Sequence, residues 1–246
     1  MDVKKKYGLT FFEYKGEGND KAYLVAQEFV EELFFLMSKL STRFCNDKYD
    51  FCDLPYTYTE RRIDSVLLPA LSKLCNSLVL TELPVERKLK GELSAGRIDY
   101  WCIYKDYSFI IELKQGFDDF ETDNTRQKAF LENWAVMIEQ LDSVKSEAKG
   151  YEEKTKGIIR LGLHIITSYS KKSPTSEVVS SFDAARIEDI AARFLRDSKK
   201  KTPSRKPDTI LCWKIPQRIV KEGGITYPGL WCVSKIYPPI IHGGAK

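Results

Sequence analysis

Apolar and polar residues alternate in the middle of the chain with the period of two that β-strands show. The runs 98–104 and 107–113 are rich in Ile, Phe, Tyr and Trp, which suit a pleated and half-buried surface. Lys105 and Asp106 alone separate the two runs. The pattern therefore predicts two strands joined by a tight turn, a β-hairpin.

Apolar residues at helical spacing predict helices on both sides of this hairpin. The expected helices cover residues 22–40, 59–75, 122 to about 149, and 182–195. Thr59 is a plausible N-cap of the second helix. The helix 22–40 has an apolar face that needs covering, and packing on the core is favoured over a homodimer interface, which stays open as the alternative.

Further apolar runs predict strands at 78–83, 157–167, 209–215 and 229–237. Pro84 is expected to interrupt the first of them. Between residues 59 and 168, the predicted elements then follow in the order helix, three strands, helix, strand. The last two strands are expected to extend the same sheet.

Three charged residues, Asp99, Glu112 and Lys114, lie on the apolar hairpin. Because side chains alternate along a strand, Glu112 and Lys114 share one face, and the other face carries Phe109, Ile111 and Leu113. The neighbouring strand could bring Asp99 beside Glu112, and two hard oxygen donors at one point suit Mg²⁺. The alternative is a cross-strand ion pair on a solvated face. It is disfavoured because burying charges without a function is costly.

The spacing of Glu112 and Lys114 is common in this chain, but its setting is not. An acidic residue stands two positions before a lysine at Asp2, Glu13, Glu86, Glu112, Glu147, Glu152 and Asp197. Of these, Glu112 alone is expected to close an apolar strand and to have an Asp on the preceding strand. The setting singles out Asp99, Glu112 and Lys114 as the candidate catalytic set.

These residues, and the order of the elements that carry them, resemble the PD-(D/E)XK nuclease superfamily. The resemblance implies an α/β protein with the restriction-endonuclease-like αβββαβ core, in which helices flank a mixed central sheet. The core would span residues 59–168 of a single domain, 1–246, with an N-terminal helix and loop at 1–58 and a C-terminal αββ extension at 169–246. Ile98 stands where the motif has proline, a substitution common in the family.

The resemblance also assigns roles to individual residues. The implied catalytic residues are Asp99, Glu112, Lys114 and, in a supporting role toward phosphate or water, Gln115. The implied metal ligands are Glu60, Asp99, Glu112 and the carbonyl of Leu113, and they would hold one or two Mg²⁺ or Mn²⁺ ions. Glu82 or Glu86 could supply the extra carboxylate instead of Glu60, which is also a favourable first-turn acid of its helix.

The implied function is metal-dependent hydrolysis of phosphodiester bonds with a metal-activated water as the nucleophile. DNA is favoured over RNA as the substrate. The alternative is a catalytically inactive module of the same fold that binds nucleic acid or a protein partner.

Composition narrows the remaining classes. The chain has 246 residues, of which 43% are hydrophobic and 30% charged, as in ordinary globular proteins. Six cysteines without a C-x-x-C pair and only two histidines argue against a structural zinc site. No signal peptide or long apolar span is evident, so a cytoplasmic protein without a membrane partner is expected.

The cysteines and the basic residues add two smaller expectations. The four cysteines that stand in apolar runs are expected to be buried: Cys75, Cys102, Cys212 and Cys232. The net charge is only +4, and the densest basic run is 199–206. This run is either a phosphate-binding segment or a solvated loop.

Overall fold

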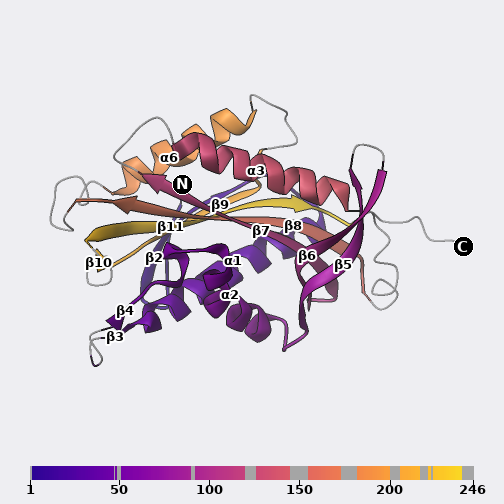
Figure 1. Ribbon diagram of the computed structural model, residues 1–246, viewed down its shortest axis with the longest axis horizontal. Coiled ribbons are helices and arrows are strands. Elements are labelled where there is room, and N and C mark those ends of the chain that lie inside the picture. The colour runs from indigo at the N-terminus through magenta and orange to yellow at the C-terminus, as the bar shows by residue number, and fades with distance from the viewer. Residues whose placement is uncertain are drawn as a thin grey trace, which may run out of the picture.

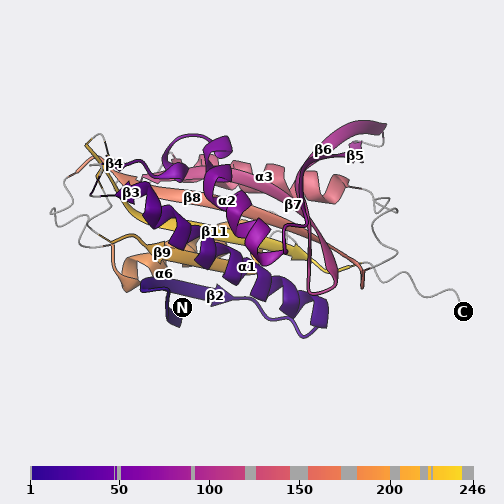
Figure 2. The same ribbon diagram turned by 90° about the horizontal axis from the view of Figure 1, so that it is seen from below.

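A mixed β-sheet forms the middle layer of the computed structural model, between two layers of helices (Figure 1). Helices α1 (Lys21–Ser41) and α2 (Glu60–Leu74) cover one face, which Figure 2 shows from below. Helices α3 (Arg126–Ser143) and α6 (Ala184–Lys199) cover the other. The structure describes residues 2–46, 48, 51–89, 92–119, 126–144, 155–172, 182–199, 206–216, 221–222 and 224–239.

The strands of the sheet lie in the order β1-β2-β9-β11-β8-β7-β6-β5, and β10 pairs with β11. Their bounds are β1 Asp2–Lys6, β2 Leu9–Lys15, β5 Val79–Leu89, β6 Glu92–Tyr104, β7 Tyr107–Asp119, β8 Ile158–Ser170, β9 Thr209–Lys214, β10 Lys221–Glu222 and β11 Ile225–Tyr237. β7 and β8 run parallel with α3 between them in sequence, and the other described pairs of this sheet are antiparallel. The α/β class and the mixed sheet flanked by helices are therefore confirmed.

The elements α2, β5, β6, β7, α3 and β8 follow one another in the predicted order. The hairpin turn is also as predicted, because Lys105 and Asp106 both have positive φ, 46° and 68°, as a two-residue type I′ turn requires. Helix α1 packs into the core beneath the sheet, and β9 and β11 extend the sheet. The four cysteines expected to be buried are buried.

Several boundaries differ from the prediction. Pro84 does not interrupt β5, where it pairs with Arg97. β5 is the edge strand, and an edge strand tolerates a residue without an N–H. Helix α3 ends at Ser143 because Val144 forms a β-bridge to Arg87. The other predicted parts of that helix, 122–125 and 145–149, lie outside the described residues.

The N-terminal hairpin of β1 and β2 was not predicted. It contains a second acid-x-Lys pair, Glu13 and Lys15, on a strand. Glu13 is buried on β2, so Glu112 is not the only acid of a Glu-x-Lys pair on an apolar strand. The carboxylate of Glu13 lies 2.7 Å from Nζ of Lys4 and 3.0 Å from Nζ of Lys15. At Glu13 the arrangement is therefore an ion-pair cluster.

The described residues of the loop between α1 and α2 include two short strands and short 3-10 turns. They are η1 (Thr42–Phe44), β3 (Cys45–Asn46), β4 (Phe51–Cys52) and η3 (Pro55–Thr57). A disulfide joins Cys45 to Cys52, a pair that the sequence did not single out. Asp47, Tyr49 and Asp50 of this loop lie outside the described residues.

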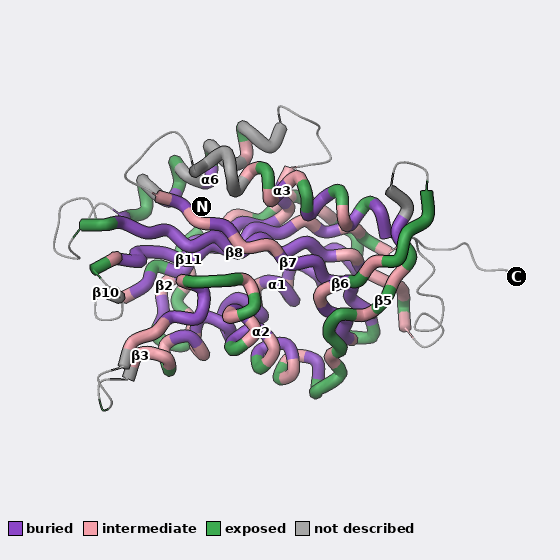
Figure 3. The backbone as a smooth tube through the Cα atoms, viewed as in Figure 1, coloured by how far each residue is buried: buried purple, intermediate pink, exposed green. Residues whose placement is uncertain are grey.

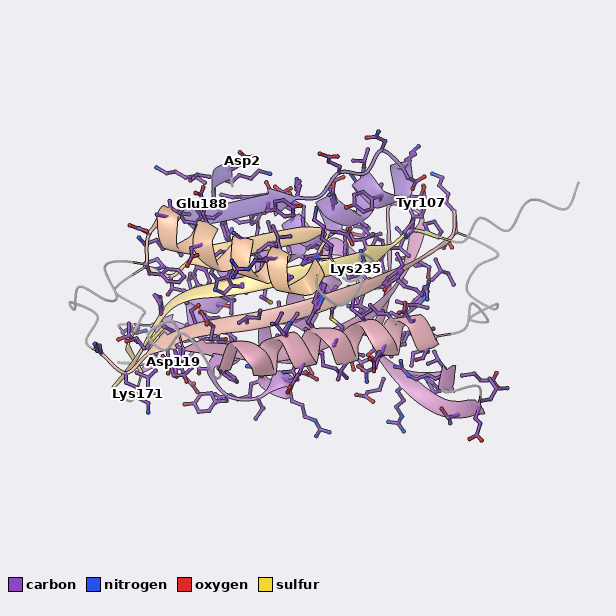
Figure 4. The ribbon with its side chains drawn as sticks, turned by 90° about the horizontal axis from the view of Figure 1, so that it is seen from above. Asp2, Tyr107, Asp119, Lys171, Glu188 and Lys235 are labelled. Atoms are coloured by element: carbon purple, nitrogen blue, oxygen red, sulfur yellow. A yellow bond between two sulfur atoms is a disulfide. The ribbon has the colours of Figure 1, made fainter. Side chains whose placement is uncertain are left out.

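The sheet buries both of its faces in its central strands (Figure 3). On β7, the side chains of Phe109, Ile111 and Leu113 belong to the core between the sheet and helices α1 and α2. Ile110 belongs to a separate cluster with Val144 at the end of α3. The alternation predicted for this strand is therefore confirmed, and it places Glu112 and Lys114 on the opposite face from Phe109, Ile111 and Leu113. Figure 4 shows that face of the sheet from above, with α3 and α6 lying across it.

Candidate active site

The pairing of β6 with β7 stops at the candidate residues. The last register pair is Tyr100 with Ile111, so one further step would place Asp99 opposite Glu112. Instead, the backbone N–H of Leu113 donates to Oδ2 of Asp99 at 2.6 Å. The carboxylate of Asp99 thus takes the place of a backbone acceptor at the β6-side edge of β7.

The pairing of β6 with β5 is interrupted at the same residue. Thr81 pairs with Tyr100 and Leu83 with Ile98, but Glu82 and Asp99 between them are not a register pair. Glu82 has φ 53°, a left-handed conformation that is unfavourable for a residue with a Cβ. Asp99 therefore lies where the pairing of β6 with β7 ends and where its ladder with β5 lacks one pair.

Glu60 reaches the same edge of β7 from the first turn of α2. Its Oε2 accepts the backbone N–H of Gln115 at 3.1 Å. The N–H groups of residues two apart point to the same edge of a strand and lie about 7 Å from each other. Glu60 and Asp99 are therefore neighbours along this edge, and the carbonyl of Leu113 points to it as well.

The two rival acids, Glu82 and Glu86, lie on β5 and are exposed. The carboxylate of Glu82 lies 3.4 Å from the guanidinium of Arg97 at the surface. Glu86 stands opposite Ala95 of β6. Of the three acids, Glu60 is the one with a contact to β7.

Glu112 is buried in an ion pair with Arg87 of β5, a residue that the sequence analysis missed. Glu112 is 1% exposed and Arg87 6%. Nη2 of Arg87 donates to Oε1 of Glu112 and to the carbonyl of Arg97. Nη1 donates to the carbonyl of Gln140 at 2.8 Å and to Oγ of Ser143 at 3.4 Å, both at the end of α3.

Gly96 of β6 makes room for the Arg87 side chain. A Cβ at position 96 would lie 2.5 Å from Nε of Arg87, much closer than two such atoms can approach. A glycine inside a strand often marks a close approach of this kind. Gly96 was therefore the signal in the sequence that could have pointed to a side chain crossing β6.

Burial raises the pKa of all three carboxyl groups. The pKa of Glu112 rises to about 7, chiefly through burial, while the ion pair with Arg87 opposes the rise. Burial likewise raises the pKa of Asp99, although the hydrogen bond from the Leu113 N–H lowers it in part. Burial also raises the pKa of Glu60, and the positive charge of Lys114 opposes this rise. Three partly desolvated acids within mutual electrostatic reach are costly to ionise together.

Lys114 follows Glu112 on the same face of β7, is half-buried, and lies in register with His164 of β8. Burial, with a smaller contribution from Lys114, lowers the pKa of His164 to about 3, so this histidine is neutral at physiological pH. Its ring stacks with Trp134 of α3 at 6.5 Å between centroids. Lys114 is thus the cation whose charge reaches Glu60, Asp99 and Glu112 together.

Gln115 acts as a clamp between three elements. Its side-chain amide donates to the carbonyl of Tyr56 at 2.8 Å, and its own carbonyl accepts from Nδ2 of Asn133 on α3, also at 2.8 Å. Its N–H binds Glu60. The structure therefore gives Gln115 a role in holding the loop before α2 and α3 against β7, and a contact to phosphate or water stays a prediction.

The oxygen donors at this edge suit a hard divalent cation. Carboxylates and a backbone carbonyl are the ligands that Mg²⁺ and Mn²⁺ take, and the donors available are Asp99, Glu60, Glu112 and the Leu113 carbonyl. Within the described residues, no group of three His, Cys, Asp or Glu side chains is arranged to hold a metal ion. These residues therefore suit a divalent cation in the type of their donor atoms and in lying along the same edge of β7.

Comparisons with known proteins add no relative: no family model, no curated protein and no solved structure matches this chain. No helix in the described part of the chain is long and apolar enough to cross a membrane. The basic run 199–206 falls mostly outside the described residues, as 200–205 do.

Proposed function

We propose that this protein is a metal-dependent nuclease that hydrolyses phosphodiester bonds in DNA, and that α2 to β8 form its restriction-endonuclease-like αβββαβ core. One observation carries the proposal: Asp99 and Glu60, from different elements, both accept N–H groups at one edge of β7, the strand that bears Glu112 and Lys114. A solvated ion pair would not need Asp99 to replace a backbone acceptor of β7 or Glu82 to hold a positive φ. Strain and interrupted pairing concentrate at functional sites.

The cofactor in this proposal is one or two Mg²⁺ or Mn²⁺ ions. Such an ion, when bound, lowers the pKa of a water molecule and neutralises charge on phosphoryl oxygens. The residues that would hold it are Asp99, Glu60, Glu112 and the carbonyl of Leu113. A cation among them would offset the cost that burial imposes on their charged forms.

The remaining residues position the reacting groups. Arg87 fixes Glu112 through Oε1, so Oε2 is the oxygen that Glu112 would present to the ion. Lys114 supplies a positive point charge beside the carboxylates, which would orient the attacking water and the phosphate. Gln115 keeps Glu60 against β7 and thereby keeps the acidic ligands in one place.

The inactive module stays the second candidate because of Arg87. Its guanidinium already neutralises Glu112 in a buried pair, which is what a protein without a metal would need. This alternative predicts nucleic-acid or protein binding without hydrolysis of any DNA in Mg²⁺ or Mn²⁺.

A cleavage panel separates the two candidates. Supercoiled, linear, single-stranded and junction DNA are incubated with Mg²⁺ or Mn²⁺ and the wild type, Asp99→Ala, Glu112→Ala or Lys15→Ala. Lys15 is the matched control, because it follows Glu13 at the same spacing on a strand at the far side of the sheet. Cleavage that is lost in the first two variants and kept in the control supports the nuclease. Cleavage that survives both Asp99→Ala and Glu112→Ala would sink the proposal, and binding without cleavage by the wild type would favour the module.

A further inference from the structure

An exposed aromatic ring lies beside the candidate site, in the segment 53–62 that leads into α2. Tyr58 is 48% exposed and stands two residues before Glu60. Two residues of chain span at most about 7 Å between Cα atoms. The ring is therefore anchored close to the carboxylate that binds the β7 edge.

Gln115 fixes the chain on both sides of Tyr58. Its side chain binds the carbonyl of Tyr56 at 2.8 Å, and its N–H binds Glu60 at 3.1 Å. The hydroxyl of Thr167 on β8 donates to the same Tyr56 carbonyl at 2.8 Å. Tyr58 is thus midway along a short segment whose two ends are tied to the sheet, and this arrangement holds its ring at the surface.

A guanidinium group lies over that ring. Cζ of Arg62 is 3.9 Å from the centroid of the Tyr58 ring, a cation–π distance. Arg62 is itself held by an ion pair with Asp53 at the start of the segment. The aromatic ring and the planar cation therefore form a pair that is fixed from both sides and still exposed.

We propose that Tyr58 and Arg62 are a stacking platform for an unpaired base, so that the substrate is single-stranded or locally unpaired nucleic acid. Aromatic rings and guanidinium planes bind unstacked bases of any sequence, whereas the bases of a duplex are already stacked. This inference rests on the proposed nuclease function for the meaning of the nearby carboxylates.

The test is equilibrium binding, measured by fluorescence anisotropy in EDTA so that no cleavage occurs. A labelled single strand and the duplex of the same sequence are titrated with the wild type, Tyr58→Ala, Tyr58→Phe and Tyr7→Ala. Tyr7 is the matched control, since it is 43% exposed with Nζ of Lys39 4.3 Å from its ring centroid. It lies in the β1–β2 turn, at the opposite edge of the sheet from β5.

Tyr58→Ala should weaken single-strand binding by about 5- to 150-fold, the range for one stacked base. The Kd of Tyr58→Phe and of Tyr7→Ala for the single strand should stay within about twofold of the wild-type value. Both variants keep an aromatic ring at position 58, on which a base can stack. Equal weakening for single strand and duplex, or no change in Tyr58→Ala, would overturn the platform. The result is independent of the cleavage panel: a protein that cuts nothing but loses single-strand binding in Tyr58→Ala keeps the platform and loses the nuclease.

Discussion

Replacing Arg87 by methionine tests how the buried ion pair with Glu112 supports the site. Both side chains are almost inaccessible to solvent, 6% and 1% exposed. Removing one partner of a buried pair leaves the other charge uncompensated, which typically costs about 3–5 kcal/mol. We expect Arg87→Met to lose stability of this order at high pH, where Glu112 is ionised.

The loss of stability in Arg87→Met should depend on pH, and the pKa of Glu112 determines whether it grows or shrinks as the pH rises. The pKa of Glu112 in the folded protein is about 7, above its ordinary value of 4.5, so ionising this group destabilises the fold as pH rises between these values. Loss of Arg87 raises the pKa further, and stability then continues to fall above pH 7. At pH 5.5, Glu112 is protonated in both proteins, and the difference should shrink to the lost hydrogen bonds, about 1–2 kcal/mol.

Urea unfolding followed by tryptophan fluorescence at pH 5.5 and pH 9 measures this difference. With a slope of about 1–3 kcal/mol per molar urea, the midpoint of Arg87→Met should fall by about 1–2 M or more at pH 9. Arg160→Met is the control, because Arg160 donates to the carbonyl of Leu141 at 2.8 Å near the same end of α3 and lies over the ring of Tyr237.

Arg160→Met should show a smaller loss that does not change with pH. The double variant Arg87→Met/Glu112→Gln removes both charges and should recover most of the stability lost at pH 9. An equal loss at both pH values, or a double variant no better than Arg87→Met, would refute the reasoning.

Three further predictions address the site and its support. Lys114→Ala should reduce the single-turnover cleavage rate by at least about 100-fold and leave the Kd for DNA unchanged, because a loss of this size is typical when one electrostatic stabiliser of the transition state is removed. Cleavage at the wild-type rate would show that the role assigned to Lys114 is wrong. Asp99→Asn keeps an acceptor for the Leu113 N–H, so calorimetry should show lost Mn²⁺ binding with a Tm within about 3 °C of the wild type; retained Mn²⁺ affinity would remove Asp99 from the ligand set. Gly162→Ala should cost about 1–3 kcal/mol by overpacking, because its Cβ would lie 2.6 Å from Cε of Met137; unchanged urea unfolding would contradict the tight packing of α3 on β8.

The hairpin could be predicted from sequence because its signals are local. Alternation over seven residues and a two-residue turn identify β6, β7 and their facing without information from elsewhere in the chain. The order of elements from α2 to β8 follows from equally local periodicities. Asp99, Glu112 and Lys114 could therefore be placed near one another before the structure was considered.

The features that were missed depend on distant partners. Arg87 stands in a charged stretch that looks solvated, and its partner Glu112 is 25 residues away. β1 is rich in lysine and β2 contains Glu13, so their polar residues mask two strands. β2 is buried through partners far along the chain, the strand β9 and the rings of Phe34 and Phe35 on α1. Pro84 indicates a strand end when the sequence is considered alone, and it is tolerated because β5 has no second neighbour in the sheet.

The pairing of β2 with β9 means that the sheet cannot be completed until late in the synthesis of these residues. Thr10 is in register with Lys214, so β2 is synthesised long before β9 and can dock only after β9 has been made. At about 5–20 residues per second, the wait is on the order of 10–40 s. During that time Phe11, fully buried in the finished sheet, has no strand β9 beside it, and the early hairpin needs shielding from other chains.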